Sequence, residues 1–377
     1  MTQPATLEKN STPPPPHAPA LPDNNVSNGY LRTRGIRILR IYRAPAQPRL
    51  SVIIPMFNTA QWIGAAIASA LDQTERRIEV VVVDDGSTDG SLDRVLSFDD
   101  DRLTILTQSN QGLSAARNSG IFVARAPLLG LLDGDDTWFP EKVQRHLELH
   151  ETSANIGVTF DWWAYLDENG DRTGQYLMHK CHQPDAKTLA RRNCVGSHVV
   201  AKKECFANVG LFDESLRSCE DLDMWIRIAS QTSFLFRLIP EVLSGYRVRE
   251  GSLSLNFDTF VRSAEVMQER VALRTPGMNE EDGRRCLSQL LRITSRKALA
   301  DGQVLVSRGL LWRALRAHSR TVLVDSRGVV LTAIHLGTFW LPTRLTYALY
   351  WWTARLAGAV ATRRLRRKGG FAHSVPA

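Results

Sequence analysis

Three closely spaced carboxylates, Asp133, Asp135 and Asp136, follow the apolar run 127–132. A short apolar run that ends in turn residues predicts a buried strand, so these carboxylates should lie at its carboxyl end. Neighbouring carboxylates repel one another unless a cation neutralises them. Oxygen ligands suit Mg²⁺ or Mn²⁺, particularly where a phosphate completes the coordination shell. Spacing alone is also compatible with an acidic turn exposed to solvent.

Two further polar clusters, 55–58 and 84–89, also follow predicted strands. Strands are expected over 50–54, 78–83, 103–106 and 127–132, alternating with helices over 61–71, 90–96, 114–123 and 141–150. This alternation predicts right-handed βαβ units and a mostly parallel sheet in an α/β fold. The carboxyl ends of parallel strands share one edge of the sheet, where ligands bind. The three polar clusters are therefore expected to converge.

The pattern weakens after the fifth predicted strand, 156–160. Beyond Asp161 we expect short strands over 195–201 and 234–238, with a helix over 222–228. From about residue 258 the periodicity becomes helical, over 258–273, 281–300 and 303–318. A helical extension is therefore predicted to follow the α/β domain.

The overall composition is that of a folded protein with appended segments. The chain has 377 residues, 43% of them hydrophobic, and a formal net charge of +8. Its five cysteines include no Cys-x-x-Cys pair, which predicts reduced thiols and a cytoplasmic protein. Residues 1–47 are rich in proline and contain no apolar signal-peptide core, so a disordered leader is expected there, with 32–43 as a solvated basic arm.

The segments around these clusters resemble family 2 glycosyltransferases of the GT-A fold. The resemblance covers about 50–255 and rests on five segments in order: 51–58, 83–89, 110–118, 132–136 and 220–227. It implies a GT-A, Rossmann-like α/β fold, in which helices flank a mostly parallel central sheet. It also implies a nucleotide-diphosphate sugar as donor, with inversion at the anomeric carbon.

The resemblance also implies roles for the acidic residues. Asp135 would bind a divalent metal, Mn²⁺ or Mg²⁺, and Asp133 would contact the sugar or the metal with its water shell. The metal would stabilise the diphosphate leaving group. Direct displacement needs a base for the acceptor hydroxyl, and Asp221 matches the family's Glu-Asp motif. Considered by spacing alone, Asp221 is more typical of a carboxylate that caps a helix, and its place in the ordered set of motifs favours the base instead.

On the nucleotide side, the resemblance implies that Pro55, Phe57 and Asn58 contribute mainly backbone. Asp85 would face the nucleobase, with uridine preferred, and Arg117 would contact the nucleotide or its phosphates. An arginine on a helix paired with an acid is an equally good interpretation of Arg117. Glu220 is a further candidate for donor binding, whereas Asp89 is expected to be a turn or capping carboxylate, and Trp225 and Arg227 are expected to be structural.

One position departs from the family pattern. Family members often have a histidine after a Tyr-Arg-x segment, as a metal or phosphate ligand, but here Arg249 follows 246–248. An arginine has no free lone pair with which to ligate a metal, although it can bind a diphosphate directly. Metal dependence is thus a weaker expectation than the donor class.

Two other groups of residues are less typical of a functional site. His179, Cys181, His182 and Cys194 contain zinc-binding residue types, but their spacing is not that of a standard zinc finger. The pair at 162–163, both tryptophans, would suit stacking on an acceptor sugar, although buried aromatics are more common.

The C-terminal segment is apolar and aromatic with interspersed arginines. We expect a helical extension over 256–325 after the glycosyltransferase domain at 48–255, and amphipathic helices with a basic tail over 326–377. The segment has no uncharged span of about 18–20 residues, so a transmembrane helix is not expected. Helices lying in a membrane interface, with a basic tail on anionic headgroups, are favoured over packing on the catalytic domain.

These observations predict an inverting glycosyltransferase that transfers a sugar to a hydroxyl of a glycan or a lipid-linked glycan in polysaccharide biosynthesis. The alternative is a protein of the same fold that binds nucleotide sugars, or acts as a scaffold, without turnover. Nucleic-acid binding is not expected, because the basic residues concentrate in the C-terminal tail. The sugar, the acceptor and the linkage are left open.

Overall fold

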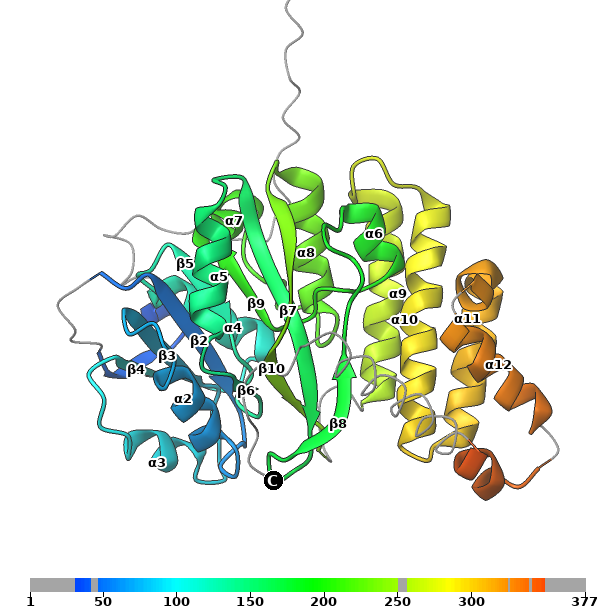
Figure 1. Ribbon diagram of the computed structural model, residues 1–377, viewed down its shortest axis with the longest axis horizontal. Helices are drawn as coiled ribbons and strands as arrows, with labels where there is room; N and C mark the ends of the chain where they lie inside the picture. Colours follow the sequence, from blue (N-terminus) through cyan, green and yellow to red (C-terminus); the bar gives the residue numbers. More distant parts are fainter. Residues whose placement is uncertain (1–30, 42–46, 250–255, 325, 339–340, 350–377) are drawn as a thin grey trace, which may run out of the picture.

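A computed structural model describes residues 31–41, 47–249, 256–324, 326–338 and 341–349. These residues form a mixed α/β domain followed by a helical extension (Figure 1). The strands are β1 Arg37–Arg40, β2 Leu50–Met56, β3 Ile78–Asp84, β4 Leu103–Thr107, β5 Leu128–Leu131, β6 Thr137–Trp138, β7 Ile156–Leu166, β8 Arg172–Leu177, β9 Val199–Lys202 and β10 Leu235–Arg247. The helices are α2 Ile63–Leu71, α3 Ser91–Leu96, α4 Leu113–Val123, α5 Lys142–Glu151, α6 Ala186–Arg191, α7 Lys203–Val209, α8 Glu220–Gln231, α9 Phe257–Arg274, α10 Glu280–Ala300, α11 Val304–Val324 and α12 Ser326–Gly337.

All strands join one sheet, with β8 attached to β7 beside the main path β1-β4-β3-β2-β5-β9-β7-β10-β6. The strands β4, β3, β2 and β5 are parallel, as the βαβ rhythm predicted. A second parallel pair, β7 and β10, is joined to them through the antiparallel strand β9. The fold class is confirmed: a mostly parallel sheet flanked by helices, with helices appended at the C-terminal end.

Alternate side chains of the central strands pack on opposite faces of the sheet. In β2, Val52 and Ile54 pack with α2, α3 and α5, whereas Ile53 packs on the other face with α4 and α8. All seven residues of β2 and of β3 are buried, which is why their sequences are continuous apolar runs rather than alternating ones. Helices therefore cover both faces of the sheet.

Three segments differ from the sequence expectations. Residues 37–40, expected in the disordered leader, form the strand β1, which pairs antiparallel with β4 at the edge of the sheet. The strand β7 continues to Leu166 instead of ending at 160, and β10 runs past Pro240 with a register shift between Ile239 and Val242. A bulge lets a strand continue past a proline, because the unpaired residue there needs no ladder hydrogen bond.

The helical extension has its own small core but also packs on the catalytic domain. Residues of α9, α10, α11 and α12 share one apolar cluster. Other side chains of the same helices, including Met267 and Leu290, join the large cluster that contains α8. Figure 1 shows α9 and α10, in yellow, standing beside α6 and α8. The expected helices beyond 349 and the basic tail lie outside the described residues.

Candidate active site

The acidic loop 133–136 lies where β5 ends, against the end of β2. The Leu132 N–H donates to the Ile53 carbonyl at 3.1 Å, which extends the pairing of the two strands by one bond. A side chain at Gly134 would place its Cβ 3.0 Å from the Pro55 carbonyl oxygen, so only glycine fits without a shift. The end of β2 is therefore in direct contact with the acidic loop, as the shared edge predicted.

Arg117 joins two of the predicted acids. Its side chain is 1% exposed on α4, and it donates to the Asp133 Oδ1 and the Glu220 Oε1, at 2.7 Å in both cases. Burial alone would raise the pKa of the Asp133 carboxyl, but the Arg117 charge lowers it below the usual value. Arg117 is thus paired with two acids, and pairing with an acid was one of the two interpretations that the sequence left open. These pairs connect the end of β5 to the first turn of α8.

Asp221 lies beside this triad, in the first turn of α8. Its Oδ1 accepts the Leu222 N–H at 2.7 Å. Burial raises the pKa of the Asp221 carboxyl, and the Asp133 charge raises it too, against the lowering effect of Arg117. An acid whose pKa is raised in this way is better suited to accept a proton near neutral pH. Asp221 therefore bonds the backbone of its own helix beside Glu220, and its role as base stays a prediction.

Asp135 is paired with the arginine that departs from the family pattern. The Arg249 Nε donates to the Asp135 Oδ2 at 2.7 Å, and the guanidinium carbon lies 4.5 Å from the centre of the Trp62 ring. Burial raises the pKa of the Asp135 carboxyl and so does the Asp133 charge, whereas Arg249 lowers it. Asp133 lies two residues before Asp135, and Arg117 joins it to Glu220, the chain neighbour of Asp221.

The ends of β2 and β3 carry the residues predicted to contact the nucleotide. Asp85 accepts three hydrogen bonds from the loop that leads into α4: from the Gln108 Nε2 at 2.8 Å, the Gln111 N–H at 2.9 Å and the Gly112 N–H at 2.7 Å. Its carboxylate thus organises this loop, and its contact with a nucleobase stays a prediction. Asp89 accepts the N–H groups of Ala60 and Ser91, each at 3.0 Å, as expected of a turn carboxylate.

The residues after β2 present both backbone and an aromatic ring. Asn58 has a positive φ of 51°. Its Oδ1 accepts the Thr88 N–H at 2.8 Å, and its own N–H donates to Ser87 at 3.1 Å. Phe57 is 45% exposed. An exposed ring beside strand-end backbone is a suitable surface for a base or a ribose.

The middle of the chain matches a known family by sequence. Residues 51–209 match the profile described as glycosyl transferase family 2. By sequence, this segment of the chain is therefore similar to family 2 glycosyltransferases.

Relatives of this domain are named as glycosyltransferases. An uncharacterized glycosyltransferase of Rickettsia bellii is 29% identical over 222 residues, which cover 55% of this chain and 31% of the relative. The putative teichuronic acid biosynthesis glycosyltransferase TuaG of Bacillus subtilis is 26% identical over 217 residues, covering 56% of this chain and 83% of TuaG. The chain spans only about a third of the length of the Rickettsia bellii protein and of several similar relatives.

Solved structures share the fold of the family 2 domain. S. aureus TarS 1-349 in complex with UDP-GlcNAc superposes with a TM-score of 0.54 at 18% identity, covering 86% of this chain and 93% of TarS 1-349. The mannosyltransferase PcManGT from Pyrobaculum calidifontis, in complex with GDP-Man and Mn²⁺, gives 0.50 at 16% identity, covering 90% and 94%. The GT-A fold expected from the sequence is therefore confirmed.

The family 2 domain offers a divalent metal only part of a coordination shell. Asp133 and Asp135 supply carboxylate oxygens of the type that Mn²⁺ and Mg²⁺ prefer. Within the described ranges, however, no group of three histidine, cysteine or acidic side chains lies close enough to hold a metal ion. The carboxylates fit a metal that takes its remaining ligands from donor phosphates and water, a common arrangement for Mg²⁺.

The residues that anchor the acidic loop 133–136 were not predicted from the sequence. Asp136 is buried, and it accepts the Arg247 N–H at 2.8 Å and a hydrogen bond from the His198 Nε2 at 3.0 Å. Burial raises the pKa of the Asp136 carboxyl to about 6. The Arg247 side chain also donates to the Asp135 carbonyl at 2.7 Å. The third acid of the motif thus anchors the loop to β10, and only its fixed spacing after Asp135 signals this role.

Neither the histidine–cysteine group at 179–194 nor Trp163 forms a site of the kind considered from the sequence. Cys194 is a buried free thiol, and no zinc-type cluster is found among the residues described. Trp163 is 8% exposed and packs its ring 5.1 Å from that of His179 and 5.2 Å from that of His198. Trp163 is therefore a core residue of β7 rather than a platform open to a sugar.

Proposed function

We propose that this chain is an inverting glycosyltransferase that transfers a sugar from a nucleotide-diphosphate sugar, preferably a UDP-sugar, to a hydroxyl of a glycan or lipid-linked glycan. The observation that carries this proposal is the acidic cluster of Asp133, Glu220 and Asp221 around Arg117, in a family 2 domain at the open edge of a mostly parallel sheet. UDP-GlcNAc and GDP-Man in the two structural neighbours support a nucleotide-sugar donor. The name of TuaG supports a cell-surface polysaccharide as acceptor.

The proposed reaction is a single displacement. The acceptor hydroxyl oxygen attacks the anomeric carbon, its proton passes to the Asp221 carboxylate, and the bond from that carbon to the diphosphate breaks with its electron pair on the diphosphate oxygen. Attack from the face opposite the leaving group inverts the configuration. Arg117 fixes Asp133 and Glu220, so that the acids do not need to reorganise as the charge moves.

Arg249 and Asp135 would border the diphosphate. A divalent cation held by Asp133 and Asp135 would supply Lewis-acid stabilisation of the leaving group. Arg249 is the second cationic group at this position, and a guanidinium binds phosphate oxygens through charge-assisted hydrogen bonds. Phe57 and Asp85 are the proposed contacts for the base, with Pro55 and Asn58 contributing backbone.

Donor turnover is the first test of this proposal. Purified protein is incubated with a panel of nucleotide sugars, with and without Mn²⁺, and the release of free nucleotide diphosphate is measured. Turnover of one donor by the wild type supports an enzyme. UDP binding by calorimetry without turnover of any donor would instead favour the alternative, a nucleotide-sugar-binding protein of the same fold.

Asp221→Asn tests the base. Transfer to an acceptor alcohol is expected to fall by about 10²–10⁴-fold, because proton removal by a positioned base contributes that much. UDP affinity should not change. Asp258→Asn is the matched control, since it removes an acid from the first turn of another helix, α9. Full transfer activity in Asp221→Asn would refute its role as base.

A membrane surface is the second proposed partner. Exposed apolar side chains of α11 and α12 include Leu305 (70% exposed), Trp312 (52%) and Leu336 (59%). Trp312 and Leu336 line the same groove, near Arg308. Apolar side chains with interspersed arginines are typical of interfacial helices. No described helix is sufficiently long and apolar to cross a bilayer.

Vesicle flotation tests this surface. Vesicles of phosphatidylcholine with phosphatidylglycerol should carry the wild-type protein, and Trp312→Glu with Leu336→Glu should weaken the binding severalfold. Leu273→Glu is the control, because this leucine is 71% exposed on α9. Equal flotation of all three proteins would exclude the α11–α12 surface as the membrane contact.

A further inference from the structure

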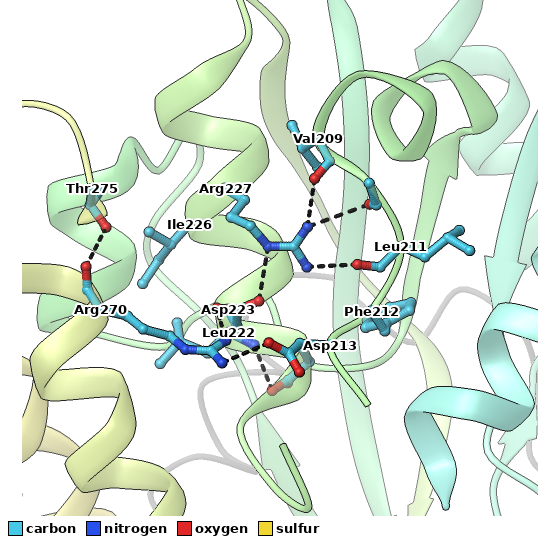
Figure 2. A network of polar contacts seen from close by, with 12 residues as sticks. Val209, Leu211, Phe212, Asp213, Leu222, Asp223, Ile226, Arg227, Arg270 and Thr275 are labelled. Carbon is cyan, nitrogen blue, oxygen red and sulfur yellow. Dashed lines mark hydrogen bonds and ion pairs between the residues drawn. The ribbon is translucent and has the colours of Figure 1, made fainter. Parts of the chain in front are cut away.

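One ion-pair network joins the helical extension to the first turn of α8. Arg270 of α9 donates to the Asp223 Oδ1 at 2.7 Å and to the Asp213 Oδ2 at 2.6 Å (Figure 2). Asp223 is two residues beyond Asp221 on α8, and its side chain is 7% exposed. A buried carboxylate needs such partners, because an unpaired buried charge is strongly unfavourable.

The backbone immediately before the acidic pair is held in an uncommon conformation. Cys219, the N-cap of α8, has a φ of 61° and a ψ of 13°, in the left-handed region. Residues other than glycine rarely adopt this conformation unless surrounding contacts hold them there. The Asp223 N–H donates to the Cys219 carbonyl at 3.0 Å. Asp223, which pairs with Arg270, is therefore hydrogen-bonded to Cys219, the residue with the left-handed backbone.

The same network fixes the segment that precedes α8. Arg227 donates to Asp223 at 2.9 Å, and its two Nη groups donate to the backbone carbonyls of Val209, Gly210 and Leu211 (Figure 2). Asp213, the other partner of Arg270, lies in this segment.

The preceding segment is also bonded to α4. Asn118 exchanges two hydrogen bonds with the backbone of Phe212, each at 2.9 Å. Arg117, the neighbour of Asn118, holds Asp133 and Glu220. The network that starts at Arg270 thus continues to the helix that carries the central arginine of the site.

A second helix of the extension places a cationic side chain near the first turn of α8. The charge of Lys297 on α10 also interacts with that of Asp221. Burial lowers the pKa of the Lys297 ammonium group to about 8. The extension therefore borders the first turn of α8 with two cationic side chains.

We propose that Arg270 is a positioning residue, through which the helical extension holds the first turn of α8 so that Asp221 faces the acceptor. This inference rests on the proposed function, since it assigns a use to the Asp221 orientation. Arg270 lies beyond residue 209, where the family match ends, so the extension would be part of the catalytic unit of this chain.

The test compares Arg270→Met, Arg270→Lys and Arg313→Met in the full chain. Arg313→Met is the matched control, because it removes an exposed ion pair between α11 and Glu265 of α9, at 2.6 Å. Three quantities are measured for each protein: hydrogen exchange of a peptide spanning 218–224, UDP affinity by calorimetry, and kcat and KM for the donor turned over by the wild type.

For Arg270→Met we expect amide exchange in 218–224 to accelerate at least tenfold and kcat to fall at least tenfold, with UDP affinity and donor KM within twofold of wild type. Arg270→Lys should recover part of kcat, since a lysine can pair with one carboxylate but not bridge two. Arg313→Met should match the wild type in all three measurements.

Three outcomes would overturn the inference. The first is unchanged exchange in 218–224. The second is accelerated exchange with unchanged kcat. The third is a parallel loss of kcat, UDP affinity and thermal stability, which would make Arg270 merely a structural contact. If the wild type turns over no donor, the proposed function fails separately, and the exchange of 218–224 still decides whether Arg270 orders this turn.

Discussion

Replacing Arg117 by methionine should destabilise the fold, because it removes the cation that neutralises Asp133 and Glu220. The methionine keeps much of the apolar length of the side chain but removes the charge that joins Asp133 and Glu220. Neither acid has room to turn fully to solvent, because their side chains are 23% and 10% exposed. Both carboxylates would then be partly buried without their counter-charge.

The size of the effect follows from the geometry. Two unit charges about 4 Å apart interact by about 4 kcal/mol at an effective dielectric constant of about 20. Removal of one partner from a buried ion pair costs about 3–5 kcal/mol of folding free energy. Water still reaches Asp133 and offsets part of the loss of two pairs. We therefore expect Arg117→Met to lower the free energy of unfolding by about 3–5 kcal/mol, a large share of the 5–15 kcal/mol typical of a domain.

Urea unfolding followed by tryptophan fluorescence measures this change. Arg313→Met is the control, because removing its exposed pair should cost about 0–1 kcal/mol. A triple variant, Arg117→Met with Asp133→Asn and Glu220→Gln, removes the unpaired charges. It should recover much of the lost stability without recovering donor turnover.

The reasoning would be refuted by either of two results. One is a loss of less than about 1 kcal/mol for Arg117→Met, which is within the range for an exposed pair. The other is a triple variant no more stable than the single variant, since the cost would then come from lost packing rather than from unpaired charge.

Three further predictions concern packing, pH and the metal. Gly120→Ala should lower the free energy of unfolding by about 1–3 kcal/mol, because the added Cβ would lie 2.5 Å from the Ile53 side chain of β2. Gly309→Ala should raise the free energy of unfolding in the same urea assay, because no atom lies within 4 Å of the added Cβ in the helix α11. Burial lowers the pKa of His146 to about 4, so the unfolded chain binds more protons than the folded chain between about pH 4 and 6.5. Stability should therefore fall as the pH falls through that window, and it should fall less steeply in His146→Gln. Parallel profiles of melting temperature against pH for the two proteins would contradict this prediction. Arg249→Met should tighten Mn²⁺ binding to the UDP complex about tenfold in calorimetry, since Asp135 loses a competing charge-assisted bond; equal or weaker Mn²⁺ affinity would count against that competition.

The central strands were predictable because burial on both faces dictates their sequences. The side chains of β2 and β3 pack on opposite faces of the sheet, so nearly every position in these strands is apolar. A strand with one face in solvent would instead alternate apolar and polar residues. Their shared carboxyl edge then follows from parallel pairing, and it places Asp85 and Asp133 on one side of the sheet. These parts of the fold and site depend on local pattern and on connection rules, both of which a sequence contains.

The partners of the site arginines were not predictable in the same way. Arg117 pairs with Glu220 across 103 positions, and Arg249 pairs with Asp135 across 114. No local periodicity encodes such distances, and the sequence left the role of Arg117 open. Similarly, β1 forms because the edge of β4 offers unpaired backbone groups, a tertiary property that a short basic segment does not reveal.

The two arginines of the site pair with different acids, and this difference separates the environment of the proposed metal ligand Asp135 from that of the proposed base. Arg117 is enclosed between α4, β5 and α8, so its pairs with Asp133 and Glu220 can open only if the fold loosens. Arg249 follows β10, against the Trp62 ring, and its pair with Asp135 joins the end of β10 to the loop after β5 rather than to a helix. A cation that binds Asp135 would therefore compete with Arg249 for that carboxylate. The departure from the family pattern at this position alters the environment of Asp135 while the Arg117 triad and Asp221 stay in place, so metal affinity and the proton-accepting step should respond to different mutations.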